Sequence, residues 1–236
     1  MAEQLLKSKN VLLTGASRGI GSAIAEIYAK HGARLYIVAR DEEKLAGVAE
    51  KCKELGSPEV SIIQADLTKG DDLVRVAAEV GGDLDVLVNN AGMAATGGIL
   101  QGNPDEWEKI VMLNLVTPMK LTGLFAPALT SRKGYIINIS SVAGLHAIKG
   151  QAPYCASKWG MTGWSLTCLE DLKEHGVGVT AIFPAYVESD MTASASFPSD
   201  QMIRPEDIAQ AALLPFRMSR YAVPSEIVVR NAVRPQ

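Results

Sequence analysis

Tyr154 and Lys158 are the residues of this sequence whose types and spacing point most directly to chemistry. They lie four residues apart in a segment predicted to be helical, so their side chains share one face. At about 4 Å and an effective dielectric constant near 20, an ammonium stabilises a phenolate by at most about 4 kcal/mol, or roughly three pKa units. Tyr154 is therefore expected to titrate near neutral pH as a general acid or base. The alternative is an interfacial tyrosine beside a solvated lysine.

A glycine-rich turn is the second chemical feature. Gly15, Gly19 and Gly21 follow the apolar run NVLLT and come directly before a helical pattern. Backbone N–H groups and the helix dipole at such a turn can bind a pyrophosphate. The spacing GxxxGxG differs from the commoner GxGxxG, and a plain tight turn is the alternative.

The turn resembles the opening signature TGxxxGxG of the short-chain dehydrogenase/reductase family, which residues 14–21 match. The resemblance extends over nearly the whole chain. NNAG at 89–92, Asn114, SSVAG at 140–144 and YCASK at 154–158 follow in the family's order. Ser141 also lies thirteen residues before Tyr154, as the family pattern requires. Several independent motifs in register make this a specific resemblance.

The resemblance implies that the catalytic residues are Asn114, Ser141, Tyr154 and Lys158. In reduction, Tyr154 would donate its proton to the forming alkoxide while Ser141 hydrogen-bonds the carbonyl oxygen. In the family, the lysine also holds the nicotinamide ribose, and the asparagine anchors a water that completes a proton relay. Taken alone, Asn114 within VMLNLV is equally well explained as a buried polar residue.

The resemblance also implies a cofactor site along the same edge of the fold. It consists of the glycine loop, the residues after the second, third and fourth strands, the acid/base pair and the loop after the sixth strand: Gly15, Ser17, Arg18, Gly19, Ile20, Gly21, Arg40, Asp66, Leu67, Asn90, Ala91, Gly92, Tyr154, Lys158, Pro184, Val187 and Ser189. Ala185 replaces the glycine that usually follows the proline. This leaves the geometry of the last loop open.

The choice of cofactor rests on Arg40 and Arg18. An acidic residue after the second strand binds the ribose 2′-OH of NAD, whereas arginine accommodates a 2′-phosphate. Here LYIVA ends in Arg40, and Arg18 lies in the glycine loop. The sequence therefore favours NADP(H). The alternative is that Arg40 is merely solvated and that Asp41 binds the ribose of NAD.

Strand-length apolar runs alternate with amphipathic stretches, which predicts an α/β fold with a doubly wound, seven-stranded parallel sheet between helices. We expect strands near 10–14, 34–39, 60–64, 86–89, 135–139, 177–183 and 226–230. We expect helices at 20–31, 41–55, 69–80, 105 to about 130, about 152–174 and after Pro205. Every motif then falls at or after the carboxyl end of a strand, where open α/β sheets bind ligands.

Length and composition predict one Rossmann-type domain over residues 1–236, with a short substrate flap at about 188–204. The chain is 47% hydrophobic, with a net charge of −3 and no basic run, so nucleic acid is not an expected partner. No signal peptide or membrane span is expected, and we place the protein in the cytoplasm. Three cysteines without CxxC spacing suggest neither disulfides nor a metal site. A homodimer and a homotetramer both remain open.

The leading hypothesis is NADPH-dependent reduction of a ketone, aldehyde or 3-oxoacyl carbonyl, or the reverse alcohol oxidation. One alternative is an NAD-dependent alcohol dehydrogenase, which Arg40 disfavours. Another is a non-catalytic sensor that binds a dinucleotide, which would not need Asn114, Ser141, Tyr154 and Lys158 together.

Overall fold

A single seven-stranded parallel sheet organises the chain, with strand order β3-β2-β1-β4-β5-β6-β7. The computed structural model describes residues 4–94, 98–192 and 197–233. The strands are β1 (Asn10–Thr14), β2 (Arg34–Ala39), β3 (Val60–Gln64), β4 (Val86–Asn89), β5 (Tyr135–Ile139), β6 (Gly178–Pro184) and β7 (Glu226–Val229). β4 and β6 are buried throughout, as expected of central parallel strands that are covered on both faces. The predicted doubly wound sheet is confirmed.

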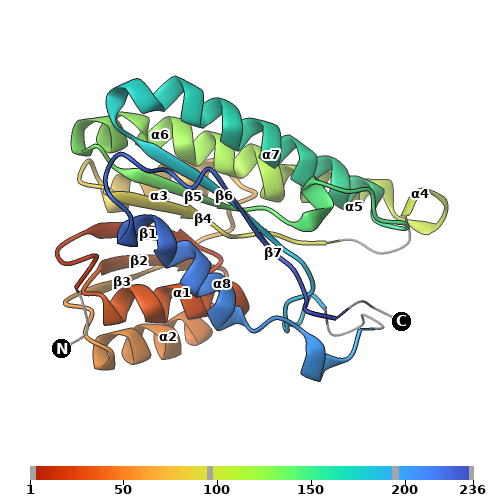
Figure 1. The fold of residues 1–236 in the computed structure, drawn as a ribbon, viewed down its shortest axis with the longest axis horizontal. Coiled ribbons are helices and arrows are strands. Elements are labelled where there is room, and N and C mark those ends of the chain that lie inside the picture. Colours follow the sequence, from red (N-terminus) through yellow and green to blue (C-terminus); the bar gives the residue numbers. More distant parts are fainter. Residues whose placement is uncertain (1–3, 95–97, 193–196, 234–236) are drawn as a thin grey trace.

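Helices cover both faces of this sheet (Figure 1). One layer contains α1 (Gly19–Lys30), α2 (Glu42–Glu54) and α8 (Pro205–Leu213), and the other contains α3 (Gly70–Val80), α6 (Thr117–Arg132) and α7 (Ala152–Leu172). Short elements complete the described chain: α4 (Gly98–Gln101), α5 (Pro104–Val111), η1 (Met112–Val116), η2 (Val142–Gly144), η3 (Lys173–His175), η4 (Ser199–Gln201) and η5 (Leu214–Arg217). Each layer buries its own hydrophobic core against the sheet.

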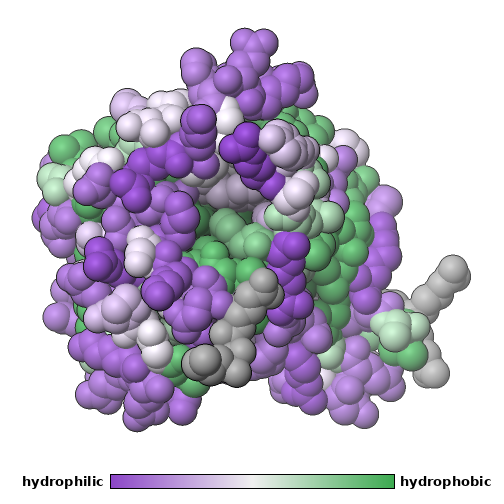
Figure 2. Space-filling model, turned by 60° about the vertical axis from the view of Figure 1, so that its left-hand side comes forward, coloured by the Kyte–Doolittle hydropathy of each residue, from purple (hydrophilic) through white to green (hydrophobic). Residues whose placement is uncertain are grey.

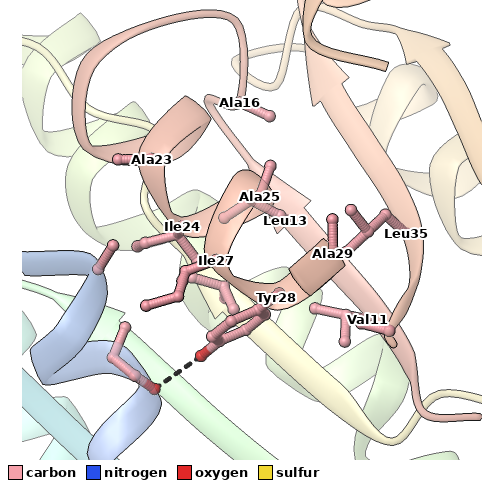
Figure 3. Packing of buried hydrophobic residues seen from close by; sticks show 14 of the residues in the cluster. Val11, Leu13, Ala16, Ala23, Ile24, Ala25, Ile27, Tyr28, Ala29 and Leu35 are labelled. Atoms are coloured by element: carbon pink, nitrogen blue, oxygen red, sulfur yellow. Dashed lines mark hydrogen bonds between the residues drawn. The ribbon is translucent and has the colours of Figure 1, made fainter. Parts of the chain in front are cut away.

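Tyr28 shows how the first layer is fixed in place (Figure 3). Its ring is fully buried on α1, and its hydroxyl donates a 2.7 Å hydrogen bond to the carbonyl oxygen of Ala212 on α8. Phe216 packs edge-on against the same ring at 5.8 Å. Because a buried hydroxyl needs a partner, this bond satisfies Tyr28 and ties α8 to α1.

The predicted long helix from Asp105 to about Thr130 runs from Pro104 to Arg132 and contains a π-helical turn. α5 and α6 are separated by η1, a π-helical turn that contains the buried Asn114. Such turns widen the helix by one residue and are frequent at functional sites. The sequence therefore predicted the helix but not the π turn inside it.

The stretch Pro104–Arg132 is also long and apolar enough, by length and composition alone, to cross a membrane. Core helices of soluble proteins meet the same criterion. In this fold Ile110, Leu121, Phe125 and Leu129 on that stretch are buried. These four residues therefore serve the packing of the domain.

Figure 2 shows the face that includes the left-hand side of Figure 1. Most of it is hydrophilic, and hydrophobic residues line part of a hollow near its centre. The strands run toward the right in Figure 1, where β7 ends close to the C-terminus. The predicted site residues follow the strands at that opposite, carboxyl edge.

Candidate active site

The crevice lies where the order of the strands reverses. β1 is hydrogen-bonded to both β2 and β4. The helices that follow β2 and β4 in the chain lie on opposite faces of the sheet. Ligands of open α/β sheets bind at such a switch point. The glycine turn follows β1 and the NNAG motif follows β4, so the fold brings these two segments together.

The glycine turn packs directly on the NNAG loop. Gly15 has φ +66°, and a Cβ there would lie 2.8 Å from Ala91 Cα, so no side chain fits. Asn90 donates from Nδ2 to the carbonyl oxygens of Thr14 at 2.9 Å and Gly15 at 3.0 Å. The Thr14 hydroxyl accepts from the N–H groups of Asn90 and Ala91 at 3.0 and 3.1 Å. Asn90 therefore holds the turn in shape.

The start of α1 is suited to an anion. Its N-cap is Arg18, with no side-chain cap and no acidic residue in the first turn, whereas α2 is capped by Asp41 and begins with two glutamates. A Cβ on Gly19, which has φ +57°, would meet only Ser189 Cβ, at 3.8 Å. The unpaired N–H groups of a first turn attract a pyrophosphate. Ser17, Ile20 and Gly21 complete this turn, which therefore fits a dinucleotide.

The two arginines differ in their surroundings. Arg18 forms a 2.5 Å ion pair with Asp190, and both side chains are exposed. The exposed Arg40 guanidinium has no hydrogen bond or ion pair among the described residues, although its charge helps to lower the pKa of Asp66. Asp41 accepts from the Lys44 N–H as the cap of α2, which lowers the pKa of its carboxyl. Thus Arg40 is available to an anion, while Asp41 has a structural task.

Asp66 and Leu67 follow β3 as predicted. A hydrogen bond from the Thr68 hydroxyl to Asp66 Oδ1, at 2.8 Å, is the main cause that holds the pKa of Asp66 below its usual value. The Leu67 side chain is buried, and its carbonyl oxygen accepts from the Thr117 hydroxyl at 2.6 Å. Both residues are held rigidly beside the crevice.

Asn114 joins the loop after β4 to α7. Its Oδ1 accepts from the Met93 N–H and its Nδ2 donates to the Met93 carbonyl oxygen, each at 2.8 Å. Nδ2 also donates to Ser157 Oγ at 3.0 Å. Gly92 lies against the same amide, since a Cβ there would be 3.2 Å from Asn114 Oδ1. The side chain thus positions two segments of the site.

Ser141, Tyr154 and Lys158 come together at the end of β5. The Ser141 hydroxyl hydrogen-bonds Tyr154, and Ala143 N–H donates to Ser141 Oγ at 3.1 Å. Lys158 is 5% exposed, and its Nζ lies 5.7 Å from the centre of the Tyr154 ring. Nζ donates to the Ile139 carbonyl oxygen at 2.9 Å. Serine, phenol and ammonium therefore form one cluster.

The pKa of Tyr154 corrects the expectation drawn from the sequence. Burial raises it above the usual value, and the Ser141 hydrogen bond offsets only part of this. Burial also lowers the pKa of Lys158 to about 8. Lys158 does not bring the pKa of the phenol down to neutrality, because its ammonium is itself desolvated and donates to the Ile139 carbonyl. Tyr154 therefore keeps its proton at neutral pH.

The loop after β6 is regular despite Ala185. The positive-φ residues of the described chain do not include Ala185, whose N–H donates to the Val229 carbonyl oxygen at 2.9 Å. Pro184 is buried and its carbonyl oxygen lies 3.5 Å from Ser141 Oγ. The carbonyl oxygen of Val187 accepts from the Thr192 hydroxyl at 2.5 Å, and that hydroxyl accepts from the Ser189 N–H. The glycine of the family pattern is not required here.

Sequence reasoning missed three residues that hold the site together. Thr14 bonds the NNAG loop, Ser157 bonds Asn114, and Asn231 bonds Tyr186. Thr14 belongs to the TGxxxGxG signature and Ser157 to YCASK, so their motifs provided a signal. Nothing in the local sequence marks Asn231.

Comparison with known proteins agrees with this geometry. Residues 9–198 match the family model described as short chain dehydrogenase. The chain belongs to the short-chain dehydrogenase family.

Several known proteins are similar to this chain over nearly its whole length. A 3-oxoacyl-[acyl-carrier-protein] reductase of Chlamydia muridarum is 32% identical over 89% of this chain and 90% of its own length. An uncharacterized oxidoreductase of Staphylococcus saprophyticus is 30% identical over 95% and 98%. A metagenomic short-chain oxidoreductase solved in complex with NADP is 37% identical, with a TM-score of 0.84 over 97% of this chain and 100% of its own. An alcohol dehydrogenase of Thermococcus sibiricus, complexed with 5-hydroxy-NADP, is 25% identical with a TM-score of 0.89 over 98% and 100%.

Proposed function

We propose that this short-chain dehydrogenase uses NADP(H) to reduce a ketone, aldehyde or 3-oxoacyl carbonyl, reversibly, with Tyr154 as the general acid and base. One observation carries the proposal: Ser141, Tyr154 and the buried Lys158 form one hydrogen-bonded and electrostatic cluster at the carboxyl edge of the sheet.

The cluster suits proton donation to a developing alkoxide. Tyr154 holds its proton at neutral pH because burial raises its pKa. Ser141 and Tyr154 offer two adjacent hydroxyls to one carbonyl oxygen, and hydrogen bonds to that oxygen strengthen as its negative charge grows. Lys158, with a pKa of about 8, is mostly charged at neutral pH and favours the phenolate left behind. Asn114 keeps α7 and the Met93 loop in register around the cluster.

The residues that would hold the cofactor follow the same edge. The uncapped start of α1, from Ser17 to Gly21, would bind the pyrophosphate, and Arg18 with Arg40 the 2′-phosphate. Asp66 and Leu67 would contact the adenine, Asn90 to Gly92 and Lys158 the riboses, and Pro184, Val187 and Ser189 the nicotinamide end. When bound, the reduced nicotinamide supplies the hydride.

The relatives support this assignment. Two similar solved structures contain NADP or 5-hydroxy-NADP, and a relative of similar length is a 3-oxoacyl-[acyl-carrier-protein] reductase. The Arg40 guanidinium, which has no ion pair within the described part of the chain, and the capping role of Asp41 favour the 2′-phosphate over the NAD-dependent alternative.

We also propose that the 188–204 segment, of which residues 193–196 lie outside the described residues, is a flap over the carbonyl and that the protein is a homodimer or homotetramer. α6 and α7 expose apolar side chains that suit contact with a second copy, among them Met119, Leu124, Trp159 and Leu166. Sedimentation of the purified protein tests the assembly.

A cofactor titration combined with a panel of carbonyl compounds tests the function. NADPH should bind at least about tenfold more tightly than NADH, and Arg40→Ser should remove most of that difference. At least one ketone, aldehyde or 3-oxoacyl thioester should cause loss of NADPH absorbance. Equal affinity for the two cofactors would contradict the arginine argument, and a silent panel would contradict carbonyl reduction.

A further inference from the structure

The end of the chain contacts the loop after β6 through one side chain. Asn231 Oδ1 accepts from the Tyr186 N–H at 3.0 Å, and Nδ2 donates to the Tyr186 carbonyl oxygen at 3.1 Å. Nδ2 donates a second hydrogen bond to the Gln201 carbonyl oxygen, also at 3.1 Å. Both donors of the amide are thus used, and its orientation is fixed because Oδ1 faces an N–H and Nδ2 faces two carbonyls.

The strand register explains why this contact falls on residue 231. β6 and β7 pair in parallel up to Pro184 and Val229. Continued by two residues, the same register sets Tyr186 opposite Asn231. β7 ends at Val229, so the Asn231 amide, which carries the same donor and acceptor as a peptide group, takes the place of the missing strand.

Asn114 makes the same contact on the other side of the crevice. Its amide also pairs with both the N–H and the carbonyl oxygen of one loop residue, Met93. Met93 follows β4 and Tyr186 follows β6, on either side of β5, which carries Ser141 at its end. Each asparagine therefore fixes a loop that borders the Ser141–Tyr154 cluster.

Tyr186 is the base of the 188–204 segment. Its ring stacks on the buried Phe197, with centroids 5.2 Å apart and planes 3° from parallel. Its carbonyl oxygen also accepts from the Ile203 N–H at 2.9 Å, and the Glu188 N–H donates to the Ile203 carbonyl oxygen at 2.9 Å. Arg204 forms an ion pair with Glu188. Any shift of the Tyr186 peptide therefore moves both ends of the segment.

We propose that Asn231 is a positioning residue for carbonyl binding: it fixes the Tyr186 peptide and so holds the described residues of the segment, 188–192 and 197–204, beside the crevice. The proposal rests on the proposed function, because that segment contributes to turnover only if the carbonyl binds beneath it.

Steady-state kinetics of Asn231→Ala and Asn231→Asp provide the test. Asn231→Ala removes all three hydrogen bonds, and Asn231→Asp keeps the acceptor but loses both donors. For each, kcat/KM for the carbonyl should fall about tenfold or more, mainly through KM, because a misplaced loop weakens substrate positioning. The dissociation constant of NADPH should change less than about threefold, because the glycine turn and arginines are untouched.

Asn10→Ala is the matched control. Asn10 also donates from Nδ2 to a backbone carbonyl, that of Asp83 at 2.7 Å, but it lies at the opposite edge of the sheet. The Asn10→Ala substitution should leave the KM for the carbonyl and the KM for NADPH unchanged. If the Asn231 variants keep the wild-type KM, or if Asn10→Ala raises KM equally, the proposal is wrong.

Hydrogen exchange separates this proposal from the proposed function. In the protein without substrate, the amide of Tyr186 should exchange at least about tenfold faster in Asn231→Ala than in wild type, because its acceptor is gone. Unchanged exchange contradicts the positioning role. This measurement needs no turnover, so it decides the role of Asn231 even if every carbonyl in the panel is inert.

Discussion

Two buried charges lie at opposite edges of the same sheet. Asp85, at the amino edge, has a side chain only 2% exposed and accepts hydrogen bonds from Lys9, Arg132 and the Asn10 N–H. Lys158, at the carboxyl edge, is 5% exposed and, among the described residues, its ammonium donates to the Ile139 carbonyl alone.

The difference in partners sets the effect on each pKa. Burial alone would raise the pKa of Asp85, but the hydrogen bonds from Arg132, Asn10 and Lys9 bring it below the usual value. Burial of Lys158 has no such compensation and lowers its pKa to about 8. A compensated charge stabilises the fold, whereas an uncompensated one costs stability and is kept for its chemistry.

Replacement of Lys158 should have the largest effect. Lys158→Met should lower kcat/KM for a carbonyl by roughly 10²- to 10⁴-fold, because the phenolate loses its nearby cation. The free energy of unfolding at pH 7 should equal or exceed that of wild type, as measured by urea denaturation. A variant that is both active and less stable would make Lys158 an ordinary structural residue.

Alkaline pH should reveal the cost of burying Lys158. Its pKa is about 8 when folded, against 10.5 for a free lysine, so between these values the unfolded chain binds more protons. Stability carried by this group therefore rises with pH, by about 2 kcal/mol from pH 7 to 10. Urea denaturation across this range should show the rise in wild type relative to Lys158→Met. If the free energy of unfolding depends on pH in the same way in wild type and Lys158→Met, the lowered pKa of Lys158 is contradicted.

Replacement of Asp85 should affect stability and spare catalysis. Asp85→Asn should lower the free energy of unfolding by about 2 kcal/mol, less than for a fully buried pair because Lys9 and Arg132 can regain water. The pKa of Asp85 is lowered on folding, so its contribution is present above about pH 4 and is lost as the pH falls. The difference between variant and wild type should therefore shrink in acid.

Asp83→Asn is the control for that experiment. Asp83 lies 3.5 Å from Arg132 but its side chain is 84% exposed. The Asp83→Asn substitution should lower the free energy of unfolding by less than about 0.5 kcal/mol. The kcat should be unchanged in both Asp83→Asn and Asp85→Asn. Equal losses for Asp83 and Asp85 would show that burial is not what distinguishes them.

Much of the fold was predictable because the strands are apolar runs with clear boundaries. β1 to β5 begin and end where the sequence predicted. The motifs also identified the cluster of Ser141, Tyr154 and Lys158. Tyr154 and Lys158 lie four residues apart on one helix and Ser141 follows a strand, so their spacing determines that the three side chains lie close together. Distant contacts are a different matter. The π turn around Asn114 is stabilised by Met93, 21 residues away, and leaves no trace in the local period.

The pKa shifts and the contact of Asn231 could not be predicted from the sequence either. The sequence predicted that Lys158 lies beside Tyr154, but it did not predict the burial of both residues or the hydrogen bond from Lys158 to the Ile139 carbonyl. The pKa of Tyr154 was therefore predicted to fall, whereas it is raised. Asn231 becomes visible only once β6 and β7 are in register. Both depend on tertiary contacts, which spacing alone does not encode.

Turnover by Tyr154→Phe, measured together with NADPH binding, tests the central claim most directly. The substitution removes only the hydroxyl that supplies the proton. We expect kcat to fall by roughly 10²-fold or more while the dissociation constant of NADPH changes less than about threefold. Undiminished turnover by a folded Tyr154→Phe protein would contradict the assignment of Tyr154 as the general acid and base.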